Sequence, residues 1–122
     1  MTEVRVLVVD DQEPYRRAMA AVVEATDGFA VVGVVGTGEE SLDAVAALHP
    51  SLVLMDVNLP GISGVEAAGR MREADGAGPV VVLLSTYDED EFDRSDAGTT
   101  AYVSKASFSP ERLRQVWQES RG

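Results

Sequence analysis

Hydrophobic residues in this chain follow two alternating patterns, short uninterrupted runs and longer stretches in which they recur at helical spacing. An uninterrupted Val/Leu run is typical of a strand buried on both faces in a parallel sheet. Two such runs end in acids, Val-Leu-Val-Val before Asp10 and Asp11, and Leu-Val-Leu-Met before Asp56. Together with the other apolar segments they predict five strands, over residues 6–9, 30–35, 52–56, 80–84 and 101–105.

Helix-start signals lie between these runs. Pro14 suits a first helical turn, and the helical spacing that follows it is expected to continue until Gly28. Three further starts come from a Ser or Thr that can cap a helix, two of them in capping-box spacing with a Glu three residues later. These pairs are Thr37 with Glu40, Ser63 with Glu66, and Ser109 with Pro110.

Strands separated by single helices imply right-handed crossovers and an α/β fold, with helices on both faces of a parallel sheet. Two common solutions are the flavodoxin-like strand order 2-1-3-4-5 and one half of a Rossmann fold. In both, ligands bind beyond the carboxyl ends of the strands. The residues that reach this edge are Asp10, Asp11, Asp56, Ser85 and Lys105.

Three carboxylates at one edge repel one another, which raises the pKa of at least one of them unless a cation is shared. Mg2+ is a hard ion that takes one or two carboxylates and keeps positions for waters and a phosphoryl group. Asp56 could then act as a nucleophile toward phosphorus, with Lys105 and Ser85 contacting the transferred group. The alternative is that each acid caps a helix and that Lys105 only ends a strand.

Composition narrows the function further. The chain has 122 residues and a net charge of -11, with no Cys. This length indicates one domain, and the acidity argues against binding to nucleic acid or an anionic membrane. No apolar stretch approaches the roughly 20 residues of a membrane helix, and the N-terminus shows no signal peptide. A cytoplasmic protein is therefore expected.

Taken together, these motifs resemble the receiver domain of two-component response regulators. The resemblance covers the whole chain and includes four segments, Val-Leu-Val-Val-Asp10-Asp11, Leu-Val-Leu-Met-Asp56-Val-Asn-Leu-Pro60-Gly61, Val-Leu-Leu-Ser85-Thr86 and Ala-Tyr102-Val-Ser-Lys105. The branch it resembles most carries a helix-turn-helix DNA-binding effector. The resemblance implies the flavodoxin-like order 2-1-3-4-5.

The same resemblance implies site roles. Asp56 would take a phosphoryl group from a sensor histidine kinase, and Lys105 and Ser85 would contact its oxygens. Asp11, Asp56 and the backbone carbonyl of Asn58 would hold Mg2+ directly, with Asp10 acting through water. Tyr102 would be the aromatic residue whose rotamer reports the switch.

It also implies a non-enzymatic phosphoacceptor that assists its own phosphorylation and dephosphorylation. Residues 1–122 are expected to form one receiver domain without an effector domain in this chain. It is either a stand-alone receiver or part of a longer regulator, and the branch resemblance favours the second. Phosphorylation is expected to control that effector, with any homodimer formed through the first and last helices. No direct contact with nucleic acid or membrane is expected.

Three features depart from the family pattern: Ala106 replaces the frequent Pro, Thr86 replaces the frequent Ala, and the segment after Tyr87 is short and acidic. Between Asp88 and Asp96 the only large apolar residue is Phe92, too little to bury a helical stripe. We expect a short or mobile fourth helix that phosphorylation orders, or one shortened with no switching role. Bulky Tyr87 is expected to slow loss of the phosphoryl group.

Rival functions remain. A dehalogenase-like phosphatase needs a second acid two residues after its Asp nucleophile, where this chain has Asn58. A flavodoxin-like nucleotide binder needs a Gly-rich loop where Asp10 and Asp11 stand. A receiver that works by protein binding alone usually lacks the acceptor or the Lys. Among other residues, His49 is expected to cap a helix, Trp117 to pack in the core, and Tyr102 to be buried on an edge strand.

Overall fold

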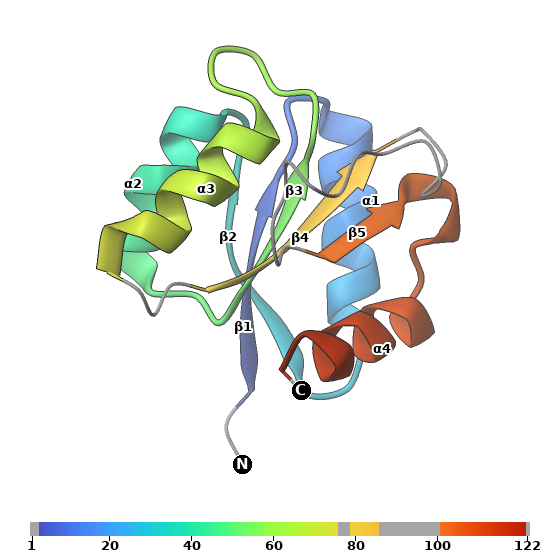
Figure 1. Ribbon diagram of the computed structural model, residues 1–122. Helices are drawn as coiled ribbons and strands as arrows, with labels where there is room; N and C mark the ends of the chain where they lie inside the picture. The colour runs from blue at the N-terminus through green and yellow to red at the C-terminus, as the bar shows by residue number, and fades with distance from the viewer. Residues whose placement is uncertain (1–2, 76–78, 86–100, 122) are drawn as a thin grey trace.

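The computed structural model describes residues 3–75, 79–85 and 101–121. They form one five-stranded parallel sheet in the order β2-β1-β3-β4-β5, with helices on both faces (Figure 1). The prediction of a flavodoxin-like fold is confirmed. The elements in chain order are β1 Val4–Val9, α1 Glu13–Glu24, β2 Phe29–Val35, α2 Gly38–Leu48, β3 Leu52–Asp56, α3 Gly64–Asp75, β4 Val80–Ser85, β5 Ala101–Ser104, a 3-10 turn η2 Lys105–Ser107, and α4 Pro110–Arg121.

Two hydrophobic cores lie on opposite faces of the sheet. Helices α1 and α4 cover one face, and α2 and α3 cover the other (Figure 1). Successive residues of β1 alternate between them, so that Val6 and Val8 enter the first core while Leu7 and Val9 enter the second. Because both faces are covered, the central strands need apolar residues at every position, which is why their runs show no alternation.

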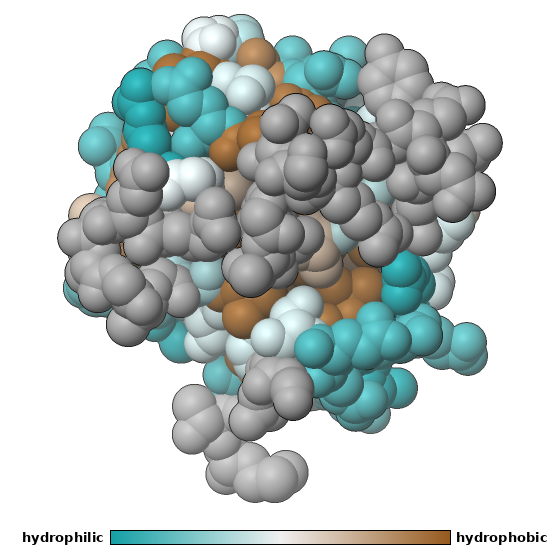
Figure 2. Space-filling view, in the orientation of Figure 1, coloured by the Kyte–Doolittle hydropathy of each residue, from teal (hydrophilic) through white to brown (hydrophobic). Residues whose placement is uncertain are grey.

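The amphipathic helices turn their polar sides outward. In α4, Leu113 and Val116 are buried in the first core, and the visible surface of this helix is hydrophilic (Figure 2). Trp117 packs beside them in an edge-to-face contact with Phe29, with ring centroids 6.4 Å apart. Such pairs add about 0.5–1.5 kcal/mol beyond the area they bury. The packing role predicted for Trp117 is confirmed.

Helix α1 ends earlier than predicted, at Glu24 rather than just before Gly28. Thr26 stops it: its hydroxyl donates to the carbonyl of Val22 at 2.7 Å, so the side chain competes with the backbone for helical acceptors. Gly28 instead serves the turn that leads into β2, where its φ of 88° favours a residue without a Cβ. The prediction that Gly28 ends the helix is therefore wrong, but Gly28 does form the turn that follows it.

The predicted caps are present, but neither capping box is complete, since the Glu40 carboxylate accepts the backbone N–H of Gly36 in place of that of Thr37. The backbone N–H of Glu40 donates to the Thr37 hydroxyl at 3.0 Å, and that of Glu66 donates to the Ser63 hydroxyl at 3.1 Å. The Glu66 carboxylate, however, pairs with Arg70 one turn later rather than reaching back to the cap. The second capping box is thus only half formed, because an exposed i,i+4 ion pair takes its acid.

At the other end of α2, His49 is the C-cap, as predicted. It has the left-handed backbone conformation, with φ 49°, and its N–H donates to the carbonyl of Val45 at 3.0 Å. The carbonyl of His49 accepts a hydrogen bond from Arg5 of β1 at 2.9 Å. His49 therefore ends the helix through its backbone.

Several expectations fall on residues that the structure does not describe: the short fourth helix between Asp88 and Asp96, the shielding role of Tyr87, and the effect of Thr86. They stay predictions. Within the described ranges, every helix is too short or too polar to cross a membrane.

Candidate functional site

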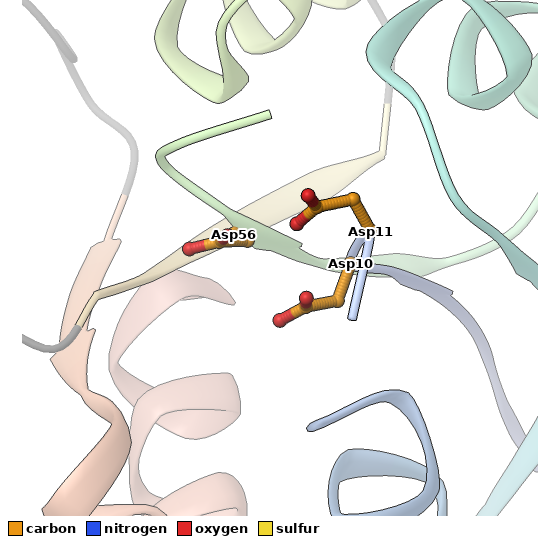
Figure 3. Close-up of side chains that lie close together, drawn as sticks. All are labelled: Asp10, Asp11 and Asp56. Atoms are coloured by element: carbon orange, nitrogen blue, oxygen red, sulfur yellow. The ribbon is translucent and has the colours of Figure 1, made fainter. Parts of the chain in front are cut away.

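Three aspartates meet at the carboxyl edge of the sheet. Asp10 and Asp11 directly follow β1, and Asp56 is the last residue of the neighbouring strand β3. One carboxylate oxygen from each lies within 4.8 Å of the others, and the three side chains project to the same side (Figure 3). Asp10 and Asp56 are buried and Asp11 is exposed. The prediction that these three carboxylates meet at one edge of the sheet is confirmed.

Asp10 is the most enclosed of the three, with 0% of its surface exposed. Its Oδ1 accepts the backbone N–H of Gln12 at 2.9 Å, and its Oδ2 accepts the Lys105 ammonium at 2.8 Å. The Arg16 guanidinium donates to its backbone carbonyl at 3.1 Å. A buried carboxylate needs such partners, because an unpaired buried charge is strongly destabilising.

Lys105, the only lysine in the sequence, brings an ammonium group into this cluster. Strand β5 ends one residue earlier than predicted, and Lys105 begins the 3-10 turn η2 because the Ser104 hydroxyl accepts the N–H of Ala106. Its Nζ lies 2.8 Å from Asp10 and 3.5 Å from Oδ1 of Asp56. The side chain is only 11% exposed, so these charges interact with little screening.

The electrostatics of Asp56 follow from its surroundings. Burial raises the pKa of this carboxyl above its ordinary value of 3.8, and the negative charge of Asp10 raises it further. The Lys105 ammonium and a hydrogen bond from the backbone N–H of Asn58 act in the opposite direction but do not cancel the effect of burial. A second cation beside Asp56 would therefore help to keep it ionised and nucleophilic.

The donor set fits a hard divalent cation. Among the described residues, three carboxylates face one ammonium, which leaves the cluster negatively charged. Carboxylate oxygens with one exposed member, Asp11, suit Mg2+, which keeps several of its waters. The residues present therefore fit the predicted metal, with Asp10, Asp11 and Asp56 as the carboxylates. The role predicted for the Asn58 carbonyl stays a prediction.

Ser85 lies where the strand pattern placed it. In the pairing of β3 with β4, Asp56 stands opposite Leu84, so Ser85 is one residue beyond Asp56 on the adjacent strand. Ser85 is buried and pairs in register with Ser104 of β5. Tyr102, two residues before Ser104, is buried on this edge strand as predicted, at 3% exposure. The structure thus brings the predicted hydroxyl to the same edge as the carboxylates.

The loop after β3 folds back on Asp56, a constraint the sequence analysis missed. A Cβ on Gly64 would lie 2.2 Å from the backbone carbonyl oxygen of Asp56, so only glycine fits there. The Gly64 N–H donates to the carbonyl of Val57 at 2.9 Å, and the N–H of Ile62 donates to the Glu39 carboxylate of α2 at 3.3 Å. The signal that could have found this was a glycine at the first position of a helix.

Tyr15 was not predicted as a site residue; it lies one residue after Pro14, at the start of the helical spacing that predicts the first helix. Its ring lies under the Lys105 ammonium, 3.7 Å from Nζ to the ring centroid. The available signal was its position in the first turn of a helix that begins just after the Asp pair.

Comparison with known proteins gives a consistent result. The family model for the response regulator receiver domain matches residues 6–118. The response regulator GacA of Pseudomonas viridiflava is 36% identical over 115 residues, which is 93% of this chain and 53% of that protein. The transcriptional regulatory protein LiaR of Bacillus subtilis is 31% identical over 98% of this chain and 57% of that protein. The chain thus spans a little over half the length of these relatives.

Solved structures agree. The signal receiver domain of the putative response regulator NarL from Mycobacterium tuberculosis superposes with a TM-score of 0.87 at 26% identity, covering 100% of this chain and 99% of that one. A LuxR-family two-component response regulator from Aurantimonas gives a TM-score of 0.83 at 29% identity, covering 97% and 84%. Both likenesses extend over essentially the whole chain.

Proposed function

Because this chain belongs to the family of response regulator receiver domains, we propose that it accepts a phosphoryl group on Asp56 in a Mg2+-dependent reaction. The observation that carries this proposal is that Asp56 lies within 4.8 Å of two other carboxylates, with the Lys105 ammonium 3.5 Å from its Oδ1. Burial raises the pKa of the same carboxyl, and a cation bound beside it would lower that pKa again. Family members are signalling domains, and we infer no enzymatic turnover of an external substrate.

In the proposed reaction, a carboxylate oxygen of Asp56 attacks phosphorus. The bond from phosphorus to the donor's leaving group breaks, and the leaving group departs with the electron pair. An acyl phosphate on Asp56 results. The transferred group carries negative charge over its oxygens, and preorganised cations and hydrogen-bond donors stabilise that charge.

Lys105 and Ser85 are the proposed partners of the phosphoryl oxygens. Lys105 supports this role by its 3.5 Å distance to Asp56, and Ser85 by its position one residue beyond Asp56 on the adjacent strand. Mg2+, bound by Asp10, Asp11 and Asp56 with the Asn58 carbonyl, would supply further positive charge. Both carboxylate oxygens of Asp10 already accept a hydrogen bond, from Gln12 and from Lys105. This supports contact between Asp10 and Mg2+ through a water molecule.

The proposed donor is a sensor histidine kinase, and the proposed output is control of an effector that binds DNA. The names of the relatives, response regulators and a transcriptional regulatory protein, support this reading. The net charge of -11 supports the view that this domain itself does not contact nucleic acid. A cytoplasmic location and homodimer formation on phosphorylation are parts of the same proposal.

Intact-protein mass spectrometry tests the central step. The purified protein is incubated with acetyl phosphate and MgCl2, with EDTA in a parallel sample. We expect the mass of one phosphoryl group to be added with Mg2+ and not with EDTA. Asp56→Asn should abolish the addition, and Asp11→Asn should raise the Mg2+ concentration it requires. Undiminished phosphorylation of Asp56→Asn would overturn the assignment.

A further inference from the structure

The Lys105 ammonium contacts an aromatic face as well as two carboxylates. Its Nζ lies 3.7 Å from the centroid of the Tyr15 ring, within the range of a cation–π interaction. The same Nζ donates to Asp10 at 2.8 Å and lies 3.5 Å from Asp56. Three groups, from α1, from the residue after β1 and from the end of β3, therefore define where this ammonium lies.

The position of Tyr15 is set by the start of α1. Pro14 occupies the first turn of the helix, and Tyr15 follows it at the edge of the sheet, with 37% of its surface exposed. The ring and the Lys105 side chain line one small cavity of about 70 Å³, whose other walls include Met19, Leu84 and Phe108. Lys105 thus borders a largely apolar cavity while its ammonium contacts the acids.

An aromatic ring holds the Lys105 ammonium differently from a further carboxylate. The ring attracts the ammonium through its quadrupole, yet it accepts no conventional hydrogen bond on its face. The ammonium can therefore lie over the ring and still donate a hydrogen bond to Asp10. A cation bound beside Asp56 would repel the Lys105 ammonium, whereas the attraction between the Tyr15 ring and the ammonium would persist.

We propose that Tyr15 is a positioning residue, whose ring face holds the Lys105 ammonium beside Asp56. This inference rests on the proposed function, because holding Lys105 matters for the reaction only if Asp56 accepts a phosphoryl group. Tyr15 itself touches no reacting atom. Its hydroxyl is not needed for the role, so phenylalanine should replace it and an aliphatic residue should not.

The contact can be measured without metal or phosphoryl donor. Lys105 is the only lysine in the sequence, so protein labelled with 13C-lysine gives one side-chain spin system in an NMR spectrum. Protons above an aromatic face shift upfield. We expect the Hε signal of Lys105 to be upfield in the native protein and in Tyr15→Phe, and to return toward the free-lysine position in Tyr15→Leu. An Hε shift that is the same in all three proteins would overturn the contact.

The role in the reaction is measured with acetyl phosphate and Mg2+, by the rate at which phosphorylated protein appears. We expect Tyr15→Leu to be phosphorylated about three- to tenfold more slowly, and Tyr15→Phe to react within about twofold of the native rate. Far-UV circular dichroism and urea unfolding show that both variants are folded. Val22→Ala, which alters the same cavity but leaves the ring, is the control and should react at the native rate.

The outcomes separate this inference from the proposed function. If the native protein reacts and Tyr15→Leu is equally fast, Tyr15 does not position Lys105 for the reaction. If Tyr15→Phe is as slow as Tyr15→Leu, the hydroxyl rather than the ring face matters, and the proposal is wrong. If the native protein takes no phosphoryl group, the proposed function fails and the role in the reaction fails with it. The NMR shift then still decides whether the ring holds Lys105.

Discussion

The Lys105 ammonium donates to Oδ2 of Asp10 at 2.8 Å, although the two residues are 95 positions apart in the chain. Asp10 follows β1 and Lys105 follows β5, so the contact extends over the ends of β3 and β4, which lie between them in the sheet. Because Asp10 is fully buried, this ion pair is the main compensation of its charge. The candidate site and the stability of the sheet edge therefore depend on the same contact.

Removing the ammonium should destabilise the metal-free protein. Lys105→Met keeps most of the side-chain volume but leaves Asp10 buried without its cation, a change that costs about 3 kcal/mol in the free energy of unfolding. Urea unfolding in EDTA measures this loss. In the Asp10→Asn background the same substitution should cost much less, because no buried charge remains to be compensated.

Combining Lys105→Met with Asp10→Asn tests whether the two charges are coupled. Equal costs of Lys105→Met in the native and Asp10→Asn backgrounds would show that the pair is not coupled. Arg17→Met, which removes an exposed ion pair with Glu13 on α1, is the matched control. It should change the free energy of unfolding by less than about 1 kcal/mol.

Asp56→Asn should stabilise the metal-free protein at neutral pH. Burial raises the pKa of Asp56 in the folded state, so between the unfolded pKa and the higher folded pKa the folded protein binds more protons. Stability from this group is present at acid pH and is lost as the pH rises through the folded pKa. The asparagine variant lacks that loss, so its advantage should grow as the pH increases.

Unfolding free energies in EDTA over a series of pH values measure this effect. Asp27→Asn, on an exposed turn, controls for removing one negative charge from an acidic protein. An advantage of Asp56→Asn that stays constant or shrinks toward neutral pH would contradict the account of its pKa.

A pair of glycine substitutions on α3 tests the close approach at Asp56. Gly64→Ala places a Cβ 2.2 Å from the Asp56 carbonyl oxygen and should destabilise the protein by about 1–3 kcal/mol or more. Gly69→Ala on the same helix meets nothing within 4 Å, and should instead stabilise by about 0.5–1 kcal/mol, since alanine favours helix. Thermal unfolding of the two variants should therefore shift in opposite directions. Shifts in the same direction would refute the described loop geometry.

Mg2+ should raise the unfolding temperature, and the rise should increase with the Mg2+ concentration. A ligand that binds only the folded state stabilises it by mass action, by about 2.7 kcal/mol at a hundredfold excess over the dissociation constant. Differential scanning fluorimetry with increasing MgCl2 measures the rise. Asp11→Asn should shift the curve to higher Mg2+ concentration, whereas Asp43→Asn on α2 should leave it unchanged. A native protein whose unfolding temperature is the same with MgCl2 and EDTA would contradict the metal site.

The sheet and the acid cluster could be predicted from sequence because both follow from local patterns. Doubly buried strands require unbroken apolar runs, and parallel strands bring their ends together. Asp10, Asp11 and Asp56 therefore had to meet. The cap positions of Thr37 and Ser63 followed from side-chain chemistry that acts within three residues.

The features that could not be predicted depend on contacts between distant segments, or on side chains that compete with the backbone for hydrogen bonds. The length of α1 was overestimated because Thr26 offers its own hydroxyl to the helix backbone before Gly28 is reached. The placement of Tyr15 under Lys105 joins the first helix to the end of the last strand, which no periodicity encodes. The constraint on Gly64 appears only once the loop after β3 is known to fold back on Asp56.

The central claim is that Asp56 itself becomes the acyl phosphate, and chemical trapping tests it most directly. Borohydride reduces an acyl phosphate of aspartate to homoserine, which marks the modified residue permanently. After incubation with acetyl phosphate and Mg2+, reduction and proteolysis, peptide mass spectrometry should find homoserine at position 56 and aspartate at positions 10 and 11. Homoserine at another aspartate, or none in a protein that has gained phosphoryl mass, would contradict the account.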